Sequence, residues 1–405
     1  MKDQKKPELL APAGDLEKLK TAVHYGADAV YFGDSRFSLR SKSRNFKDDE
    51  FRSAIEYCKC HGVKAYITFN IFPHNRDLDL LEESIRSVSL LEPDVFIVSD
   101  MGLFTLIKDV APSIPIHVSI QANSTNYRTV AFWKSLGAKR VVMARELTLD
   151  EIREIGEKVD IEREVFVHGS LCISYSGRCY LSSYLAQRGA NTGLCTNSCR
   201  WSYALVEEKR PGQYLPIHED ERGTYILSPR DLCMIEHIPA LIEAGIDSFK
   251  IEGRTKGVNY VAGVVKAYRE AIDSYFSGIS PTLERWKGEL DMVSNRGYTT
   301  GFFFGPPDSS AYNFDRSSYQ MTHEFVGITL SVYEGKAHVA LRNNLTIGDT
   351  IEYISLNSPG EPVKVTFMYG EDDQCLLKAH NNNLVTIPCT DNTHPGDVIR
   401  RSITA

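Results

Sequence analysis

The first 276 residues alternate between short apolar runs and longer amphipathic stretches. Runs such as residues 8–11, 28–32 and 64–70 predict buried strands, because they are short, rich in β-formers and closed by Gly, Pro or polar residues. The stretches between the runs have helical length and polar caps, as at Asp15, which can cap a helix that stops at Gly26. Further strands are predicted at residues 95–98, 115–120, 140–143, 164–167, 225–227 and 248–251.

This alternation is typical of a parallel α/β fold, because parallel strands need crossover connections of helical length. Eight strand–helix units that close into a TIM-like (β/α) barrel, with one short strand left outside, account for the pattern most simply. A doubly wound open sheet is the alternative. No Gly-x-Gly-x-x-Gly follows the first strand, so a dinucleotide-binding version of that sheet is disfavoured.

The character of the chain changes near residue 281. Residues 281–321 are rich in Gly, Ser, Pro and aromatic residues and predict a linker segment. Residues 322–405 contain short β-like runs separated by turn signals, which predict a small all-β barrel domain. We therefore expect an α/β barrel domain over residues 1–280, with a cysteine-rich insertion at residues 169–224.

Composition places the chain among ordinary globular proteins, with 42% hydrophobic and 24% charged residues. The sequence shows no long apolar span and no signal-peptide pattern, so we expect a cytoplasmic protein with no membrane partner. A net charge of −7 argues against a broad basic surface for nucleic acid. Arg40 lies in a local basic stretch between Asp34 and Asp48, which predicts either a phosphate or carboxylate contact or a solvated loop.

Nine cysteines, an odd number, argue against a disulfide framework in a reducing compartment. Thiolates are soft ligands, and a cluster of them predicts a metal site. An iron–sulfur cluster tolerates irregular spacing, whereas the short spacing of a structural zinc site is met only by Cys195 and Cys199. Five cysteines compete for four ligand positions, which leaves one spare: Cys172, Cys179, Cys195, Cys199 and Cys233.

A nucleophile is the other interpretation of this region. His168, Ser170 and Cys172 alternate along an extended segment, so their side chains would share one face. Nucleophilic catalysis needs a base within hydrogen-bond reach and an oxyanion hole. The sequence contains neither a nucleophile elbow nor a cysteine-protease signature, so this interpretation is disfavoured.

Polar residues follow the predicted strands, where barrel enzymes place their chemistry. Lys250 and Glu252 would share one face of their strand, with Arg254 just beyond it. Arginine side chains suit carboxylate ligands. Structural ion pairs in the barrel mouth are the alternative role for these charges. The candidates at this rim are Asn70, Asp100, Gln121, Asn123, Arg145, Glu146, His168, Lys250, Glu252 and Arg254.

The segment Glu164-x-Phe166-x-x-Gly169-Ser170-Leu171-Cys172-x4-Gly177-x-Cys179-x-Leu181-Ser182 resembles the signature of the U-32 peptidase family, also called collagenase-like proteases. The resemblance covers roughly residues 8–275, and the β segment after it resembles the C-terminal domain of the family. Similar motifs occur at residues 9–14, 25–31, 70–75, 119–123 and 249–254.

The resemblance implies an oxygen-independent hydroxylase with a 4Fe-4S cluster held by cysteines. Members of the family act on tRNA, on ribosomal RNA or on a quinone precursor, and the implied oxygen donor of the RNA-modifying members is prephenate. By its length the chain most resembles the branch that makes 5-hydroxyuridine at the wobble position of tRNA. Some members work in pairs, so tRNA and a second subunit of the family are the expected partners.

Combined with the rim residues, the resemblance gives several candidates a role. The expected catalytic residues are His168, Glu252 and Asn70. Either Cys199 or Cys233 is expected to be the cysteine left out of the cluster. A collagenase-like protease and a non-catalytic metal scaffold are the alternative functions. The expected substrate-binding residues are Arg40, Gln121, Arg145, Lys250 and Arg254.

Overall fold

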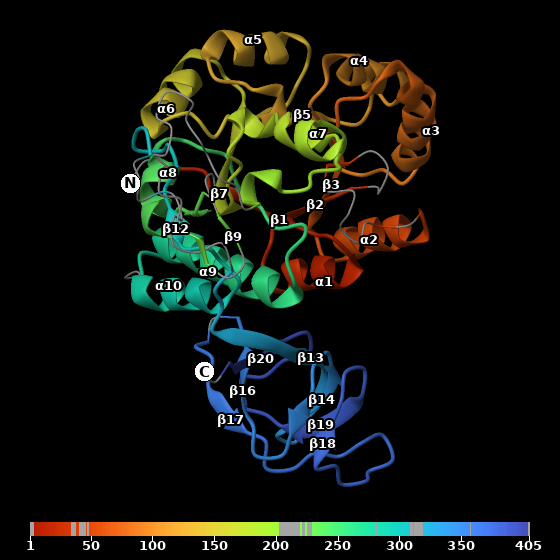
Figure 1. Ribbon diagram of the computed structural model, residues 1–405, viewed down its shortest axis with the longest axis vertical. Coiled ribbons are helices and arrows are strands. Elements are labelled where there is room, and N and C mark those ends of the chain that lie inside the picture. The colour runs from red at the N-terminus through yellow and green to blue at the C-terminus, as the bar shows by residue number, and fades with distance from the viewer. Residues whose placement is uncertain are drawn as a thin grey trace.

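Two domains make up the chain, an α/β barrel and a smaller β domain that packs against one side of it (Figure 1). In the described part of the chain, no helix is both long and apolar enough to cross a membrane. The computed structural model describes residues 4–33, 38–39, 46, 48–201, 219–220, 223–224, 229–279, 282–307, 311, 319–356 and 358–403.

Eight parallel strands form a closed barrel in the first domain, in the order β11-β1-β2-β3-β4-β5-β6-β7. The parallel pairing of β7 with β11 closes the ring. The prediction of a TIM-like barrel is therefore confirmed, and the open-sheet alternative is wrong. The strands are β1 (Glu8–Pro12), β2 (Ala29–Phe32), β3 (Lys64–Phe69), β4 (Val95–Val98), β5 (Ile116–Val118), β6 (Arg140–Val142), β7 (Glu162–Ser170) and β11 (Ser248–Ile251).

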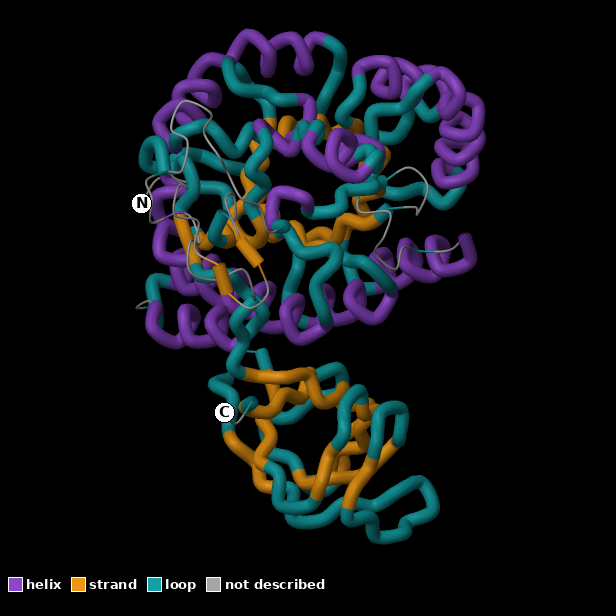
Figure 2. Tube along the Cα trace, viewed as in Figure 1, coloured by secondary structure: helices purple, strands orange, loops and turns teal. Residues whose placement is uncertain are grey.

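Helices surround the barrel, as Figure 2 shows in purple. Polar caps fix where several of them begin: the Asp15 and Asp100 carboxylates each accept a backbone N–H of the first turn, and Thr148 forms a capping box with Glu151. The helices are α1 (Leu16–His24), α2 (Asp48–Cys60), α3 (Leu78–Ser89), α4 (Met101–Val110), α5 (Tyr127–Ser135), α6 (Leu149–Lys158), α8 (Ile238–Glu243) and α9 (Val258–Ser277).

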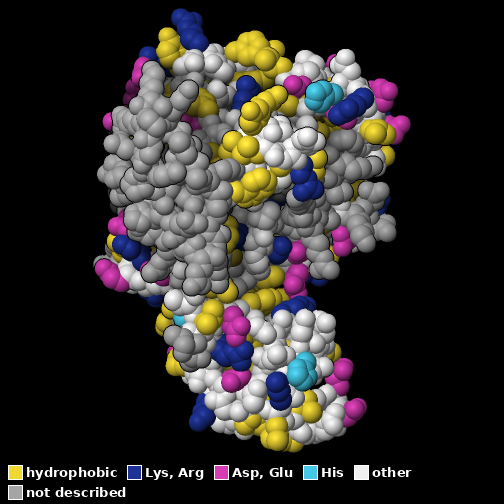
Figure 3. All heavy atoms as spheres, viewed as in Figure 1, with side chains coloured by type: hydrophobic (Ala, Val, Ile, Leu, Met, Phe, Trp, Pro, Cys, Tyr) yellow, Lys and Arg dark blue, Asp and Glu magenta, His cyan; other side chains and the backbone are white. Residues whose placement is uncertain are grey.

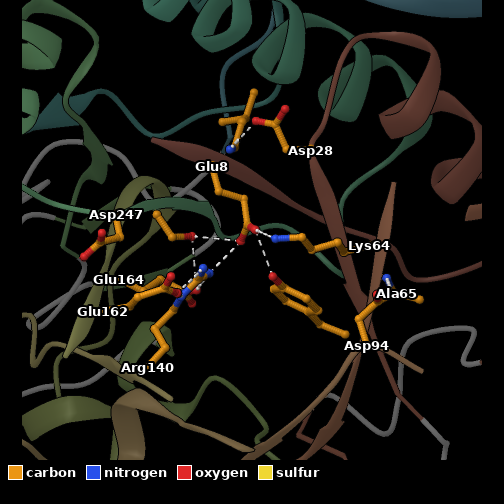
Figure 4. Close-up of polar contacts among 12 residues, drawn as sticks. Glu8, Asp28, Lys64, Ala65, Asp94, Arg140, Glu162, Glu164 and Asp247 are labelled. Carbon is orange, nitrogen blue, oxygen red and sulfur yellow. Dashed lines mark hydrogen bonds and ion pairs between the residues drawn. The ribbon is translucent and has the colours of Figure 1, made fainter. Parts of the chain in front are cut away.

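A layer of buried charges crosses the barrel at the amino ends of its strands (Figure 4). The Arg140 guanidinium lies 2.5 Å from Glu8, 2.7 Å from Glu162 and 3.1 Å from Glu164. Burial alone raises the pKa of Glu164, but the charges of Lys250 and Arg140 outweigh it and hold that pKa below its usual range. Buried charges need such partners, so this layer is a structural floor beneath the carboxyl ends of the strands.

The cysteine-rich insertion leaves the barrel after β7 and returns as β10 (Asp231–Cys233), which pairs antiparallel to the end of β7. The predicted strand at residues 225–227 lies outside the described residues. The other described elements of the insertion are η3 (Tyr175–Gly177), α7 (Leu181–Ala186), η4 (Ala190–Thr192), η5 (Ser198–Arg200), β8 (Glu219–Asp220) and β9 (Gly223–Thr224).

Part of the segment that the sequence analysis assigns to a linker, residues 281–321, has regular structure. It contains α10 (Leu283–Met292), which packs against α9, and β12 (Tyr298–Thr299), which pairs with β10. These contacts extend the barrel domain beyond residue 280. Three 3₁₀ turns complete the described barrel domain: η1 (Asn75–Asp77), η2 (Ile120–Ala122) and η6 (Ile235–His237).

The second domain is an antiparallel β sheet of six strands in the order β17-β16-β20-β13-β14-β19. The sheet curls as a half-barrel around its own core, which includes Val326, Leu341, Ile351 and Ile399, so the predicted small β domain is confirmed. The strands of this domain are β13 (His323–Tyr333), β14 (Lys336–Leu341), β15 (Leu345–Thr346), β16 (Thr350–Ile354), β17 (Pro362–Lys364), β18 (Lys378–Ala379), β19 (Leu384–Pro388) and β20 (Val398–Ser402).

Buried polar contacts join the two domains. The Tyr25 hydroxyl, at the end of α1, donates to the Ile354 carbonyl at 2.5 Å and accepts from the Val398 N–H at 2.9 Å. The buried Arg400 side chain bonds Glu289 of α10 at 2.7 Å and also pairs with Glu352 of the β domain at 2.9 Å. The β domain is therefore docked by specific hydrogen bonds rather than connected only through the chain.

We expect Tyr25→Phe to lower the free energy of unfolding by about 1–3 kcal/mol, because it leaves a buried carbonyl and a buried N–H without their partner. Urea unfolding followed by circular dichroism measures the change. Tyr333→Phe is the control, since the Tyr333 ring is 70% exposed and its loss of a hydroxyl should leave the unfolding curve in place. An unfolding midpoint equal to that of the wild type in Tyr25→Phe would show that this contact does not stabilise the docking.

Candidate functional site

A cavity of about 150 Å³ opens at the carboxyl ends of the barrel strands. Its barrel side includes Tyr31, Thr68 and Phe166, which come from strands β2, β3 and β7. Its other side comes from the cysteine-rich insertion, including Leu181 and Ser182 of α7. The insertion therefore roofs the position at which a TIM barrel carries out its chemistry.

Four of the five candidate cysteines line this cavity: Cys172, Cys179, Cys195 and Cys199. Cys233 lines a separate cavity instead, where its sulfur accepts a hydrogen bond from the Tyr268 hydroxyl at 3.8 Å. Burial raises the pKa of the Cys233 thiol to about 11. The two cavities therefore separate Cys233 from the other four thiols.

The cavity offers four thiols as candidate ligands for a metal site. Among the described residues, no three His, Cys, Asp or Glu side chains converge as one ion would require. A zinc ion needs its ligands about 2 Å from one point. An iron–sulfur cluster takes one thiolate on each of several iron atoms, so its ligands stand around a larger body. Four thiols on the wall of one cavity supply the ligand type and number that a four-iron cluster takes.

Two arginines reach the cavity from the barrel rim. Arg254, which is buried, donates to the Ser38 hydroxyl at 2.5 Å and to the Leu39 carbonyl at 2.8 Å. Arg145 donates to the Ser170 carbonyl at 3.0 Å, and its guanidinium lies 4.2 Å from the centre of the Phe166 ring. These bonds fix both cations in one geometry, as recognition of an anion requires.

The main chain of Arg254 packs closely against a glycine. Gly14 lies in the turn between β1 and α1, against the main chain of Arg254. A Cβ atom at Gly14 would sit 2.2 Å from the Arg254 carbonyl oxygen, closer than any side chain can approach. Only glycine therefore allows α1 to begin this close to the rim of the cavity.

Glu252 and Lys250 both line the cavity, but their partners differ. The Glu252 carboxylate accepts a hydrogen bond from the Tyr31 hydroxyl at 3.3 Å. Burial, with the Glu252 charge, raises the pKa of Tyr31, so that hydroxyl keeps its proton and stays a donor. Lys250 instead lies 2.8 Å from Glu164 and belongs to the structural floor, so its charge is balanced within the protein.

Asn70 and Gln121 place amides at the same rim. The Asn70 side-chain oxygen accepts the Leu39 N–H at 3.0 Å. Gln121 donates to the Gly177 carbonyl at 3.3 Å, while its buried side-chain oxygen has no hydrogen-bond partner in the described part of the chain. An unpaired buried acceptor on a cavity wall is a position that a ligand donor can satisfy.

His168 does not line the cavity, contrary to its predicted catalytic role. In the pairing of β7 with β11, Lys250 faces Phe166 and the next residue, Ile251, faces His168, so β7 carries one extra residue. This β-bulge reverses the alternation of side chains. The His168 ring therefore packs outside the barrel beside Tyr268, and burial lowers its pKa to about 3, which keeps it neutral.

The structure adds cavity residues that the sequence analysis did not single out. Tyr31, Thr68 and Ser119 each sit at or just beyond the carboxyl end of a strand, the same signal that located the other rim residues. Glu146, a predicted rim residue, accepts the N–H and the hydroxyl of Ser176 at 2.5 and 2.7 Å and so anchors the insertion to the barrel. Arg40, a predicted substrate-binding residue, lies outside the described residues.

The sequence of this chain matches the patterns of two known domain families. The sequence pattern of Peptidase family U32 matches residues 14–313, and that of the Peptidase family U32 C-terminal domain matches residues 321–400. This chain belongs to peptidase family U32. Both domains of the U32 chain are thus matched over nearly their whole extent.

Three curated relatives show how the U32 chain compares with named proteins. It is 40% identical to tRNA hydroxylation protein P1 of Bacillus subtilis, over 98% of this chain and 95% of the relative. It is 34% identical to tRNA hydroxylation protein P2 of the same organism, over 74% of this chain and 98% of the relative. It is 31% identical to a protein named Collagenase of Porphyromonas gingivalis, over 97% of each chain.

Proposed function

We propose that this U32 protein is an oxygen-independent tRNA hydroxylase that makes 5-hydroxyuridine at the wobble position, with prephenate as the oxygen donor. The names of its P1 and P2 relatives support tRNA as the substrate. The observation that carries the chemistry is the single cavity at the catalytic end of the barrel. It brings together four thiols, two arginines and the carboxylate of Glu252.

The four cysteines on the cavity wall are the ligands we assign to a 4Fe-4S cluster, with Cys233 as the spare. Their position supports this assignment, because all four come from the roof of the cavity and face the rim residues across it. When bound, such a cluster supplies redox or Lewis-acid chemistry.

The protein's own side chains bind and orient the two substrates in this proposal. Prephenate is a dicarboxylate, and the planar guanidinium groups of Arg145 and Arg254 are matched to carboxylates. Uracil offers an N3–H donor, and the Gln121 side-chain oxygen, which has no partner among the described residues, can accept its hydrogen bond. Glu252 is a carboxylate on the cavity wall that can act there as a general base. Asn70 is assigned a positioning role beside the uracil.

The protease alternative receives no support from the geometry. In the described part of the chain, no hydrogen bond joins His168 to Ser170 or Cys172, and the Ser170 hydroxyl accepts from Arg296 at 3.0 Å. A nucleophile without a base in reach is not activated. The name of the collagenase relative therefore supports membership of the family and not peptide hydrolysis by this chain.

Deletion of the gene, followed by mass spectrometry of nucleosides, tests the proposed function. We expect 5-hydroxyuridine to disappear from tRNA and to return when the wild-type gene is restored. Ribosomal RNA and the quinone pool from the same cells are measured in parallel. If tRNA is unchanged and ribosomal RNA loses a modification, the substrate is ribosomal RNA. If tRNA is unchanged and the quinone pool is lost, the substrate is a quinone precursor. Co-purification with a second family member would identify the proposed partner subunit.

We expect Arg145→Leu to raise the KM for prephenate roughly 10- to 100-fold, because a charge-assisted hydrogen bond contributes about 1.5–3 kcal/mol. The measurement is anaerobic turnover of purified tRNA at varied prephenate. Arg153→Leu on the outer wall is the matched control, since Arg153 pairs with Asp150 at the surface and should leave the KM unchanged. An unchanged KM in Arg145→Leu would remove this residue from the donor site.

A further inference from the structure

The outer face of the insertion helix α7 carries exposed aromatic rings. Tyr180, which precedes the helix, is 77% exposed, and Tyr184 within it is 78% exposed. The two are four residues apart and therefore lie on one face of the helical turn. Figure 3 shows hydrophobic side chains gathered over the region of α7. Exposed aromatic patches of this kind mark interaction surfaces.

The inner face of the same helix belongs to the cavity. Ser182 is 1% exposed, shares a hydrogen bond of 2.9 Å with the Thr196 hydroxyl, and lines the cavity together with Leu181. The exposed tyrosines and the cavity wall are thus separated by the thickness of one helix, about 10 Å. A molecule that rests on the tyrosines lies beside the mouth of the cavity.

The stretch of chain around α7 has a positive charge that suits an anionic partner. Residues 165–206 contain no Asp or Glu and include three arginines, although the whole chain has a net charge of −7. Arg188, just beyond the end of α7, is exposed, while Arg178 is held by the Gln121 carbonyl at 2.7 Å. An exposed arginine in an acid-free stretch beside exposed aromatic rings is typical of a binding surface for single-stranded nucleic acid.

We propose that Tyr180 and Tyr184 form a stacking platform for the unpaired bases that flank the target uridine of the RNA. This inference rests on the proposed function. An enzyme that modifies a base takes that base out of its stack, so the neighbouring bases lose a stacking partner. The two rings replace that partner, and Arg188 contacts the adjacent phosphate. The target uracil then reaches the cavity on the inner side of α7.

The test is the affinity for a fluorescent anticodon stem-loop RNA with an unmodified wobble uridine, measured by anisotropy at one fixed salt concentration. Cluster-containing protein is used throughout, prepared without oxygen. We expect Tyr180→Ala and Tyr184→Ala each to raise the Kd about fivefold or more, since stacking on an aromatic ring is worth about 1–3 kcal/mol per base. The variants Tyr180→Phe and Tyr184→Phe keep the ring and should retain wild-type affinity. Tyr333→Ala, a similarly exposed tyrosine of the β domain, should have no effect.

The outcomes separate this inference from the proposed function. If the wild type binds the RNA and the double alanine variant binds it equally well, the platform is wrong and the hydroxylase proposal stands. If the wild-type protein binds no RNA and deletion of its gene leaves the tRNA nucleosides unchanged, the hydroxylase proposal is wrong, and the stacking proposal that rests on it is wrong as well. Light scattering of the double alanine variant tests a third outcome. If its assembly mass changes while its Kd for the RNA does not, the tyrosines form a subunit contact and the stacking proposal is wrong.

Discussion

Cys172→Ala and Cys199→Ala are each expected to yield colourless protein that has lost most of its iron and acid-labile sulfide, whereas Cys233→Ala stays brown. The physical reason is the separation of the thiols, because the first two line the cavity with Cys179 and Cys195, and Cys233 lines another. Each cluster ligand holds its own iron atom, so one missing thiolate destabilises the whole cluster. The measurement is iron and sulfide content with a visible spectrum, on protein purified without oxygen.

The Cys233 variant is the matched control for the cysteine series, since it removes the same chemical group from a neighbouring position. A brown Cys199→Ala together with a bleached Cys233→Ala would assign the fourth position to Cys233 and contradict the geometric separation. If the wild-type protein contains zinc or no metal, the proposal of an iron–sulfur cluster is wrong. Loss of 5-hydroxyuridine in the bleached variants, with retained fold, would connect the cluster to the reaction.

Arg140→Leu is expected to lower the free energy of unfolding by about 3–5 kcal/mol, the usual cost of removing one partner from a buried ion pair. The loss leaves the carboxylates of Glu8, Glu162 and Glu164 close together without the guanidinium that they share. Burial of Glu164 then opposes its charge, and the variant should regain part of its stability at low pH, where carboxylates are protonated. Urea unfolding at two pH values measures both effects.

Arg86→Leu is the control for this prediction. Arg86 pairs with Glu82 one turn earlier on α3 at 2.6 Å, but the pair is exposed to solvent. Exposed pairs contribute little, so the free energy of unfolding should change by less than about 0.5 kcal/mol. Equal destabilisation by both substitutions would show that burial does not set the importance of the Arg140 layer.

Much of the barrel could be predicted because its signals are local. The helix expected between the Asp15 cap and Gly26 is α1 (Leu16–His24), and the strand expected at residues 95–98 is β4 (Val95–Val98). Periodicity and capping residues fix such elements within a few positions. The rim residues followed from the same reasoning, because polar residues at the ends of parallel strands converge on one edge of a barrel.

The structure departs from the local sequence pattern where tertiary pairing overrides it. His168 should point inward by simple alternation, but the extra residue of β7 turns it outward, and no sequence signal marks that bulge. Segment 281–321 looks like a linker by composition, yet β12 gains its structure only by pairing with β10. The choice between Cys199 and Cys233 depends on where β10 returns, which spacing along the chain cannot specify.

Because the β domain docks on Tyr25, the helix α1 forms a rigid connection between that domain and the cavity. One end of this nine-residue helix begins at the Gly14 turn against Arg254, and the other ends at the tyrosine that bonds Ile354 and Val398. A helix of this length spans about 13 Å and hardly compresses. A tilt of the β domain would therefore push on the backbone of a cavity arginine. The helix α1 therefore couples the position of the β domain to the backbone at the cavity mouth, so that a displacement of one displaces the other.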